Sequence, residues 1–416
     1  MSQRIAVVGS GIAGLASAWL LSHRHDVTLF EAADRLGGHT HTHRVTWQGR
    51  DYDIDTGFIV CSRANYPLFT RMLDTLGVET QPTTMSFALR NERTGLEYNA
   101  TTTAGLFVQK RRLLSPRHWR MIGDILRFYR EAPALLAQDG PGPTIGEYLA
   151  AGRYTAGFSE DHLLPMACAL WSSPTAQVRE FPAKYLVAFM ANHRMMQVDD
   201  RPQWLVVRGG SRRYVDALVR RWNVKVRTAC PVRRISRDAA GVLVAHDAGS
   251  ERFDQVVLAC HADQALALLD DARDAERSVL GAMRYQANET VLHTDARQLP
   301  RDRRAWAAWN AIVPAGDDSA CTVSYCMNLL QSLDAPVPFV VTLNRTAAID
   351  PGRVLARMTY HHPVYTHESV AAQARKAQID GVDRTWYAGA YWGWGFHEDG
   401  MRSAVGVARA LGVDWP

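Results

Sequence analysis

The sequence has little lysine, no paired-cysteine motif and no long apolar run. Only four of its 47 cationic residues are lysine, at positions 110, 184, 225 and 376, so residues 226–375 can supply no lysine to a pocket. The six cysteines form no CxxC pair and no zinc-like spacing, which predicts reduced thiols and no metal site. No apolar run reaches the roughly 18 residues that a membrane span needs. An expected first strand close to the initiator methionine leaves no room for a signal peptide, so we expect a cytoplasmic protein.

The composition is that of a globular protein. Of 416 residues, 47% are hydrophobic and 21% are charged, which excludes a disordered chain. The net charge of +5 is too small for this length to indicate nucleic-acid binding. At roughly 150 residues per domain, the length predicts two or three domains.

A β-α-β unit with a glycine-rich first turn is predicted at the start of the chain. Ile5–Val8 is an apolar run typical of a buried strand, a helical pattern follows to about His23, and Val27–Phe30 predicts a second strand. Residues 9–14 between them read GSGIAG and fit the GxGxxG motif of dinucleotide-binding turns. In that motif the first glycine allows the tight turn, the second lets a pyrophosphate approach the backbone, and the third lets helix and strand pack closely.

The residues that follow favour FAD over a nicotinamide nucleotide. Glu31 lies 22 residues after Gly9 and is placed to accept a hydrogen bond from a ribose hydroxyl, and its charge disfavours the 2′-phosphate of NADP. Residues 35–38 read RLGG, and residues 53–57 read DIDTG. Both resemble elements that extend the nucleotide site in two-domain flavoproteins.

The rest of the chain predicts a discontinuous arrangement. Residues 61–200 have mainly helical patterns, and residues 289–364 are rich in strand patterns. The buried-strand pattern Val256–Ala259 returns the chain to the nucleotide sheet. We therefore predict an α/β fold with a Rossmann-like FAD-binding domain (1–60, 201–265 and 381–416) and an α+β substrate domain (61–200 and 266–380) of mixed sheet plus helices. The expected helices include 66–76, 116–131, 182–193 and 214–222.

These motifs, with RGGS at 208–211, VVLAC at 256–260 and AGAYWGWGFHEDG at 388–400, resemble the flavin-containing amine oxidoreductase superfamily. Shorter stretches are similar to a bacterial branch of NAD/FAD-binding proteins: NYP (65–67), RPQW (201–204), MNLLQ (327–331) and YHHP (360–363). That branch resembles the flavin desaturase that acts on methylated fatty acyl chains on the route to furan fatty acids. The resemblance implies FAD, a phospholipid-bound acyl substrate desaturated by hydride transfer to flavin N5, and a methyltransferase as pathway partner.

The resemblance also implies a set of site residues. The helix beginning near Met401 would lie against the flavin, and His39 stands where amine oxidases usually place an arginine near it. The implied cofactor contacts are Gly9, Gly11, Ile12, Ala13, Gly14, Glu31, Arg35, Gly37, Gly38, His39, Val232, Gly389, Glu398 and Asp399. Tyr391, Trp392 and Trp394 are the predicted substrate-lining aromatics, whereas Phe396 is expected in the core.

His397 and Glu398 form the predicted catalytic acid–base pair, in which the carboxylate raises the basicity of the imidazole. The alternative is that Glu398 and Asp399 cap the last helix while His397 packs. His41 and His43 are expected on a polar strand face, and His193, His361 and His362 are expected to be structural.

Three functions remain open. The first is a dehydrogenase of an apolar acyl chain. The second is an amine or amino-acid oxidase, which is disfavoured because 289–364 lacks the lysine that those enzymes use and because Ala390 stands where they carry an acid. The third is a non-redox isomerase or a flavin-bearing scaffold.

The apolar stripe of the predicted helix 116–131 can be interpreted in two ways. Its stripe of Trp119, Ile122, Leu126 and Tyr129 lies among arginines and follows the cluster at 110–112. Such a helix either packs its stripe on the core or docks on an anionic membrane, which would make the protein peripheral at the inner face of the cell membrane.

Overall fold

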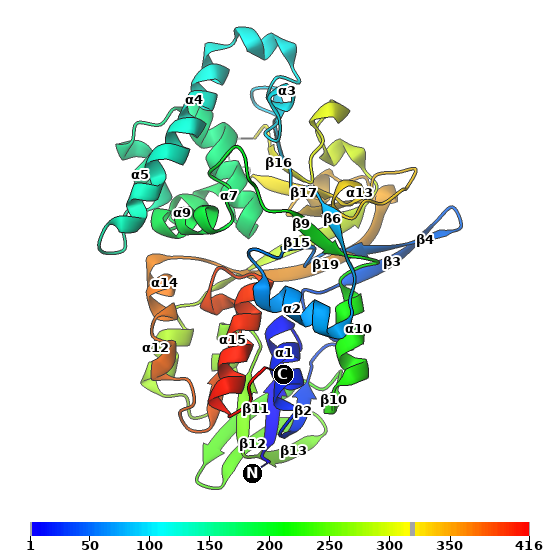
Figure 1. Cartoon of the computed structure of the whole chain (residues 1–416), viewed down its shortest axis with the longest axis vertical. Helices are drawn as coiled ribbons and strands as arrows, with labels where there is room; N and C mark the ends of the chain where they lie inside the picture. The colour runs from blue at the N-terminus through cyan, green and yellow to red at the C-terminus, as the bar shows by residue number, and fades with distance from the viewer. Residues whose placement is uncertain (1, 317–320, 416) are drawn as a thin grey trace.

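The computed structural model describes residues 2–316 and 321–415, and two stacked parts make up the molecule (Figure 1). The part that carries both termini is built on a five-stranded parallel sheet in the order β10-β2-β1-β14-β20. Its strands are β1 (Arg4–Val8), β2 (Asp26–Phe30), β10 (Val224–Arg227), β14 (Gln255–Leu258) and β20 (Thr385–Tyr387). The predicted β-α-β unit and the return of the chain at residues 256–259 are therefore confirmed.

Alternate residues of this sheet face two different cores. Val7, Leu29 and Val257 pack with helices on one face, which are α1 (Ile12–Leu21), α2 (Pro67–Leu76), α10 (Arg212–Arg221) and α15 (His397–Ala410). Ala6 and Val256 face the other core, with the three-stranded sheet of β11 (Val232–Asp238), β12 (Gly241–His246) and β13 (Gly249–Phe253) and with α11 (Ala262–Leu268) and α12 (Asp274–Leu280). Burial on both faces explains why these strands have nearly unbroken apolar sequences.

The parallel sheet draws its strands from the three segments assigned to the nucleotide domain. Val279, Met283 and Ile379 also pack in its second core, together with Ala372 on α14 (His367–Gln373), although the sequence assigned them to the substrate domain. The domain boundaries themselves stay a prediction.

The second part is built on a seven-stranded mixed sheet in the order β19-β15-β18-β17-β16-β7-β8. The strands are β7 (Phe87–Asn91), β8 (Leu96–Asn99), β15 (Tyr285–His293), β16 (Trp309–Val313), β17 (Thr322–Cys326), β18 (Val340–Leu343) and β19 (Val354–Pro363). The strand-rich pattern at 289–364 predicts β15, β17, β18 and β19, and the same region also contains β16. β7 and β8 come from the region expected to be mainly helical, and β7 runs parallel to β16.

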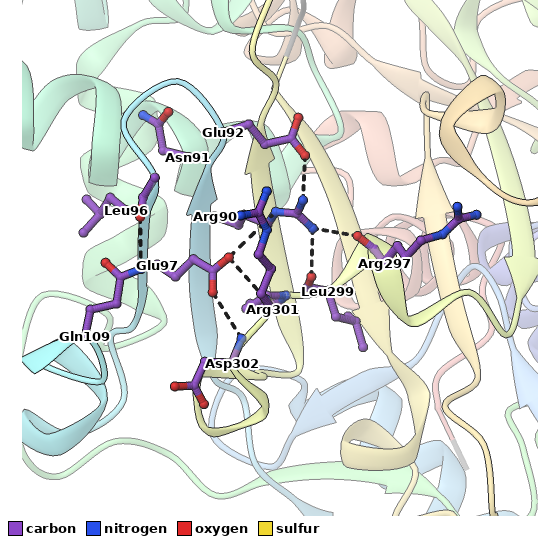
Figure 2. A network of polar contacts seen from close by, with 12 residues as sticks. Arg90, Asn91, Glu92, Leu96, Glu97, Gln109, Arg297, Leu299, Arg301 and Asp302 are labelled. Carbon is purple, nitrogen blue, oxygen red and sulfur yellow. Dashed lines mark hydrogen bonds and ion pairs between the residues drawn. The ribbon is translucent and has the colours of Figure 1, made fainter.

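A polar network fixes the edge of this sheet to the loop after residue 295 (Figure 2). The Arg90 guanidinium lies 3.0 Å from the Glu92 carboxylate and donates to the carbonyls of Arg297 and Leu299 at 2.7 and 3.1 Å. Glu97 accepts from the backbone N–H groups of Arg301 and Asp302, each at 3.2 Å. Ion pairs and hydrogen bonds together hold β7, β8 and this loop as one unit.

Helices cover the face of the seven-stranded sheet on which Leu89 and Ala311 lie. They are α3 (Thr103–Leu106), α4 (Pro116–Glu131), α5 (Ile145–Ala151), α6 (Ala156–Phe158), α7 (Leu164–Trp171), α8 (Thr175–Arg179) and α9 (Ala183–Asn192), with a 3₁₀ turn at Lys110–Leu114. The buried stripe of α4 is His118, Met121, Ile125 and Phe128. Of the predicted stripe, Ile122 and Tyr129 pack at its border, whereas Trp119 and Leu126 face outward. Among the described residues, no helix is long and apolar enough to cross a membrane.

Smaller elements join the two parts. β3 (Thr42–Trp47) and β4 (Arg50–Asp55) form a hairpin, and β5 (Val60–Ser62), β6 (Thr80–Thr83) and β9 (Trp204–Val207) form a three-stranded sheet in the order β5-β9-β6, while α13 (Met327–Leu330) follows β17. Asp55 is buried and accepts from the Ser211 N–H at 2.9 Å and from the Thr42 hydroxyl at 2.5 Å. The sequence motifs DIDTG and RGGS therefore contact each other through Asp55 and Ser211.

Candidate active site

A cavity of about 780 Å³ runs between the two parts of the molecule. One end lies at the glycine-rich turn after β1, where the wall includes exposed Ala32 and Gln264. The other end lies among the helices of the second part, where exposed Thr101, Arg194 and Arg201 contribute to the wall. A long molecule could therefore occupy the cavity from the nucleotide sheet to the helical layer.

The first end is shaped for phosphates. Gly9, Gly11, Ile12 and Ala13 line the cavity, and α1 begins there without any side chain that caps its first N–H groups. A Cβ on Gly11 would meet no atom within 4 Å, so a side chain at this position would enter open space. Free N–H groups and the positive end of the helix dipole favour an anion at this place.

Gly14 serves packing instead. A Cβ on Gly14 would lie 1.9 Å from the carbonyl oxygen of Gly9, and Gly14 is not part of the cavity wall. The three glycines of the motif therefore do different things, as the motif predicts.

Further predicted cofactor residues surround the same end. Glu31, Gly37, Gly38 and Val232 all line the cavity. The Glu31 carboxylate accepts from the Ser10 N–H at 2.8 Å, from the Ser10 hydroxyl at 2.6 Å and from the Ala33 N–H at 2.8 Å. The acid at the end of β2 is thus held beside the glycine-rich turn.

Arg35 does not line the cavity. Its guanidinium donates to the carbonyl oxygens of Gly38 and Thr40 at 2.8 and 3.3 Å. In this structure Arg35 holds the RLGG loop in shape, and its direct contact with a cofactor stays a prediction.

Four histidines gather along the middle of the cavity. His39, His261, His361 and His362 all line it, with His39 ring centroids 6.1 Å from His261 and 5.3 Å from His362. Burial lowers the pKa of His261 and His362 to about 4 and that of His39 well below its ordinary value, so these rings are neutral near pH 7. His361 and His362 are not isolated, contrary to the expectation, because strand β19 brings them beside the nucleotide part; the structural role expected for them stays a prediction.

His39 has a free polar atom. Its Nε2 is buried and has no hydrogen-bond partner among the described residues. His41 and His43 do not line the cavity; their ring centroids lie 3.9 Å apart where β3 begins, with the ring planes tilted by 39°, and His41 hydrogen-bonds the Tyr360 hydroxyl at 3.0 Å. Of the three alternating histidines after Gly38, His39 therefore lines the cavity, whereas His41 and His43 lie at the start of the β3–β4 hairpin.

His397 lines the cavity and is fixed by three neighbours. Its ring stacks on Phe58 at a centroid distance of 3.4 Å, and its Nε2 lies 3.1 Å from both the Thr40 and the Tyr214 hydroxyl oxygens. Burial lowers its pKa to about 3, so the ring is neutral and cannot act as an acid near pH 7.

The predicted His397–Glu398 pair is not formed. The Glu398 carboxylate points to the start of α2, where it accepts from the N–H groups of Leu68 and Phe69 at 3.1 and 3.0 Å. Asp399 caps its own helix by accepting from the Phe396 N–H at 3.1 Å, and α15 begins at His397 rather than near Met401. Neither carboxylate lines the cavity, so in this structure both are structural caps.

The aromatic run after Gly389 divides between the cavity and the core. Gly389, Tyr391, Trp394 and Phe396 line the cavity. Trp392 does not, and its indole N–H instead donates to the Tyr387 carbonyl at 3.2 Å. The prediction was therefore wrong for Trp392, whereas Phe396 packs against the core as expected and also lines the cavity.

The inner wall of the far half of the cavity is mainly apolar and aromatic, with Arg194 and Arg201 at its exposed end, and sequence reasoning missed nearly all of it. Its wall is supplied by β7 and the residues before it, α7, α9, β9, β16 and β17, and includes Met85, Phe87, Met166, Leu170, Trp171, Phe189, Trp204, Trp309 and Tyr325. Among the described wall residues Glu31, at the opposite end, is the only carboxylate. A local pattern could not show these contacts, because the residues come from separate elements that only the tertiary fold brings together.

No lysine lies in the cavity wall that the structure describes. Lys184 donates to the carbonyls of Gln138 and Gly140, and Lys376 pairs with Asp380. The described residues also hold no group of His, Cys, Asp and Glu side chains that could bind a metal ion.

Fold and cavity together define a dinucleotide-binding flavoprotein class. The family model of flavin containing amine oxidoreductases matches residues 12–294. The chain therefore belongs to that family, and FAD is its cofactor. The open space at Gly11, the uncapped start of α1 and the free Nε2 of His39 are consistent with that assignment.

Individual relatives are more distant. A protein of Mycobacterium tuberculosis (strain H37Rv) with the provisional name flavin-containing monoamine oxidase AofH is 29% identical over 266 residues, which are 61% of this chain and 56% of that protein. The chain thus spans little more than half the length of this relative.

Solved structures match almost end to end. A CLA-producing fatty acid isomerase from P. acnes has a TM-score of 0.71 with 17% identity, covering 99% of both chains. A cyclohexylamine oxidase from Brevibacterium oxydans IH-35A has a TM-score of 0.69 with 17% identity, covering 99% of this chain and 100% of that one. At these identities the likeness establishes the fold alone.

Proposed function

We propose that this FAD-dependent oxidoreductase dehydrogenates an apolar acyl chain, in particular a methylated fatty acyl chain of a phospholipid. The observation that carries the proposal is the far half of the cavity, whose inner wall is mainly aromatic and aliphatic, whose arginines, Arg194 and Arg201, lie at the exposed end, and which has no described carboxylate to receive an ammonium group. An apolar chain gains most from such a wall, because burial of its surface is favourable and leaves no polar group unpaired.

The residues that would hold the cofactor lie at the other half. Gly11, Ile12 and Ala13 would meet the pyrophosphate, Glu31 the ribose, and His39 a polar atom nearer the middle of the cavity. When bound, FAD would supply the two-electron acceptor for a dehydrogenation. In that reaction one carbon of the acyl chain loses a hydride, the adjacent carbon loses a proton, and a C=C bond forms between them.

The proton needs an acceptor from the wall. Because Glu398 is engaged at α2, the described candidates are the imidazoles of the middle segment: His39, His261, His361 and His362. Burial keeps the lone pair of one ring nitrogen free near pH 7 in His39, His261 and His362, although their lowered pKa values make these three rings weak bases. The surrounding aromatic side chains would exclude water from the same segment.

Two alternatives share this cavity. A fatty acid isomerase has the same fold, which favours an acyl substrate while leaving open a reaction without net oxidation. Relatives named as amine oxidases favour an amine substrate, against which stand the lysine-free wall and the absence of a carboxylate in its far half.

Product mass separates the three reactions. The purified holoenzyme would be mixed with a methyl-branched phospholipid in detergent micelles and an artificial electron acceptor. The proposal predicts an acyl product lighter by a pair of hydrogen atoms. An isomer of unchanged mass would establish the isomerase, and turnover of amines with peroxide release, without any change in the lipid, would establish the oxidase.

A variant at the entrance of the far half sharpens this assay. Ala100 lines the cavity beside exposed Thr101. Ala100→Trp should abolish turnover of the long chain while the flavin stays bound and chemically reducible, and Ala100→Ser is the matched control. Full turnover by Ala100→Trp would contradict entry of the chain at this end.

The wider context follows from the same proposal. The methyl branch of the substrate would come from a methyltransferase that acts earlier in the sequence of reactions. A phospholipid substrate also requires the protein to bind a membrane peripherally, at the inner face of the cell membrane.

A further inference from the structure

The segment from Lys110 to Leu126 exposes large apolar side chains. Leu114 is 89% exposed, Leu126 53%, Trp119 50% and Leu113 49%. They are not part of the stripe by which α4 packs on the core, because that stripe is formed by other residues of the helix. Six of the nine exposed large hydrophobic residues of the described chain lie between residues 113 and 198.

These side chains are held in place by the fold. The Trp119 indole N–H donates to the Leu113 carbonyl at 2.8 Å, and its ring lies 4.9 Å from that of Phe107. The 3₁₀ turn Lys110–Leu114 is thereby fixed against α4. The exposed apolar surface is therefore ordered by contacts within the protein.

The same segment carries several cations that form no ion pair with an acid of the described residues. Lys110, Arg111, Arg112 and Arg120 form no ion pair with a carboxylate of the described residues. The other cations of α4 differ, because Arg117 pairs with buried Asp161 and Arg127 pairs with Asp124, while Arg130 pairs with Glu131. Exposed apolar groups beside cations match the chemistry of an anionic lipid surface.

The segment adjoins the far end of the cavity. α4 itself contributes Tyr129 to the cavity wall. Exposed Thr101, also in the wall, lies two residues before α3, and the Leu106 carbonyl at the end of α3 accepts a hydrogen bond from His118 on α4 at 2.9 Å. In Figure 1, α3 and α4 form the end of the molecule opposite to the N-terminus. Contact at this end would place the cavity entrance at the contacted surface.

We propose that the segment Lys110–Leu126 docks on an anionic bilayer, with Leu113, Leu114 and Trp119 entering the lipid interface and the neighbouring cations meeting the headgroups. This docking surface names the place at which a phospholipid would be met, and it rests on the proposed function for its purpose. Its existence can be tested without any turnover.

Cosedimentation with vesicles tests the docking. The holoenzyme would be mixed at low salt with vesicles of phosphatidylcholine alone or with phosphatidylglycerol added. We expect binding to the anionic vesicles only, weakening as salt is raised because the charges are screened. Equal binding to both vesicle types, or no binding to either, would overturn the proposal.

Variants locate the surface. Lys110→Glu with Arg111→Glu and Arg120→Glu should lower vesicle affinity at least tenfold, and Leu113→Ser with Leu114→Ser should lower it several-fold, each with an unchanged flavin spectrum. Arg117 and Arg127 are left intact because their partners are intramolecular. Arg213→Glu with Arg220→Glu and Arg409→Glu makes the same charge change on exposed sites of the nucleotide part and should leave binding as it is. Equal losses from both triple variants would show a net-charge effect and overturn the docking surface.

Two further readouts separate this proposal from others. Sedimentation without lipid would reveal a dimer that the leucine variants dissociate if the surface covers a second copy, and that result would overturn lipid docking. Turnover of detergent-dispersed lipid should be equal in the wild type and the variants. If vesicles bind as expected but no lipid is oxidised, the docking stands and the proposed function fails. If lipid in micelles is oxidised but vesicles do not bind, the docking fails and the proposed function stands.

Discussion

Two glycines of the first turn differ in what a side chain would meet. At Gly11 a Cβ enters open cavity, and the backbone φ of −62° is one that any residue adopts, whereas at Gly14 it collides with the carbonyl of Gly9. The cofactor-binding role of the turn can therefore be tested at one of them without disturbing the fold.

Gly11→Val should abolish FAD binding while the protein stays folded, because the isopropyl group takes the space expected for the pyrophosphate. Flavin absorbance after purification and thermal unfolding measure the two effects. Gly406→Val is the matched control, since Gly406 is an exposed glycine of α15 with no atom within 4 Å of its Cβ. A yellow Gly11→Val protein would disprove the assignment of this turn.

Glu31→Ala should weaken FAD binding by about 1–3 kcal/mol, the loss expected when a charge-assisted hydrogen bond is removed. Turnover at saturating FAD should change little, because the acid lies at the nucleotide end of the cavity. Titration of the apoprotein with FAD gives the dissociation constant. Ser10→Ala removes one hydrogen bond from Glu31 but leaves the carboxylate, so an equal loss in that variant would assign the effect to the shape of the turn.

At the scale of elements, Glu398 joins α15 to α2. Its carboxylate accepts the first N–H groups of α2, so it acts as an N-cap supplied by another helix. Glu398→Ala should lower the free energy of unfolding by about 0.5–2 kcal/mol, with the turnover of each bound flavin nearly unchanged. Urea unfolding and steady-state kinetics measure the two. A large loss of turnover at unaltered stability would restore the catalytic role that the sequence suggested.

Elements with a strong local pattern could be predicted from the sequence. The strand Val256–Ala259 has an unbroken apolar pattern because both faces of the parallel sheet are covered, and the helix 116–131 begins at a serine cap followed by proline. β7 and β8 were missed because Phe87–Asn91 is short and mixes apolar with polar residues, and because its parallel partner β16 lies more than 200 residues away. Local periodicity carries no information about such a partner.

The candidate site follows the same division. Its glycine-rich end is continuous in sequence, so a motif could locate Gly9, Gly11 and Glu31. Its middle unites His39 with His261 and His362 from three distant segments, and its far half is assembled from helices and strands of the second part. The His397–Glu398 pairing failed because neighbours on a helix point in different directions, about 100° apart around its axis.

At the scale of the whole molecule, many buried histidines make stability depend on pH. Burial lowers the pKa of His162 and His397 to about 3 and that of His193, His261, His293 and His362 to about 4. The unfolded chain binds protons at these sites below about pH 6.5, and the folded chain does not. The contribution of these histidines to the free energy of unfolding is therefore fully present above about pH 6.5 and is lost as the pH falls toward 4.

The urea midpoint should accordingly fall between pH 7.5 and pH 5.5, with each histidine adding at most about 1.4 kcal/mol per pH unit. Burial raises the pKa of Asp55 to about 6 and also raises the pKa values of Glu398 and Asp399, which opposes the trend, but these three carboxyls are fewer than the six histidines. Tryptophan fluorescence with FAD in excess follows the transition. A midpoint that stays constant or rises on acidification would show that the histidines are not held neutral.

The two stacked parts of the molecule bring a nucleotide end and an apolar end into one cavity, and the central claim is that electrons pass from an acyl chain at the second end to FAD at the first. Anaerobic mixing of the holoenzyme with a methyl-branched phospholipid, followed through the visible absorbance of the flavin, tests this directly. The account predicts bleaching with the branched lipid, weaker bleaching with its unbranched counterpart and none with simple amines. Flavin that stays oxidised with every lipid but is bleached by an amine would contradict it.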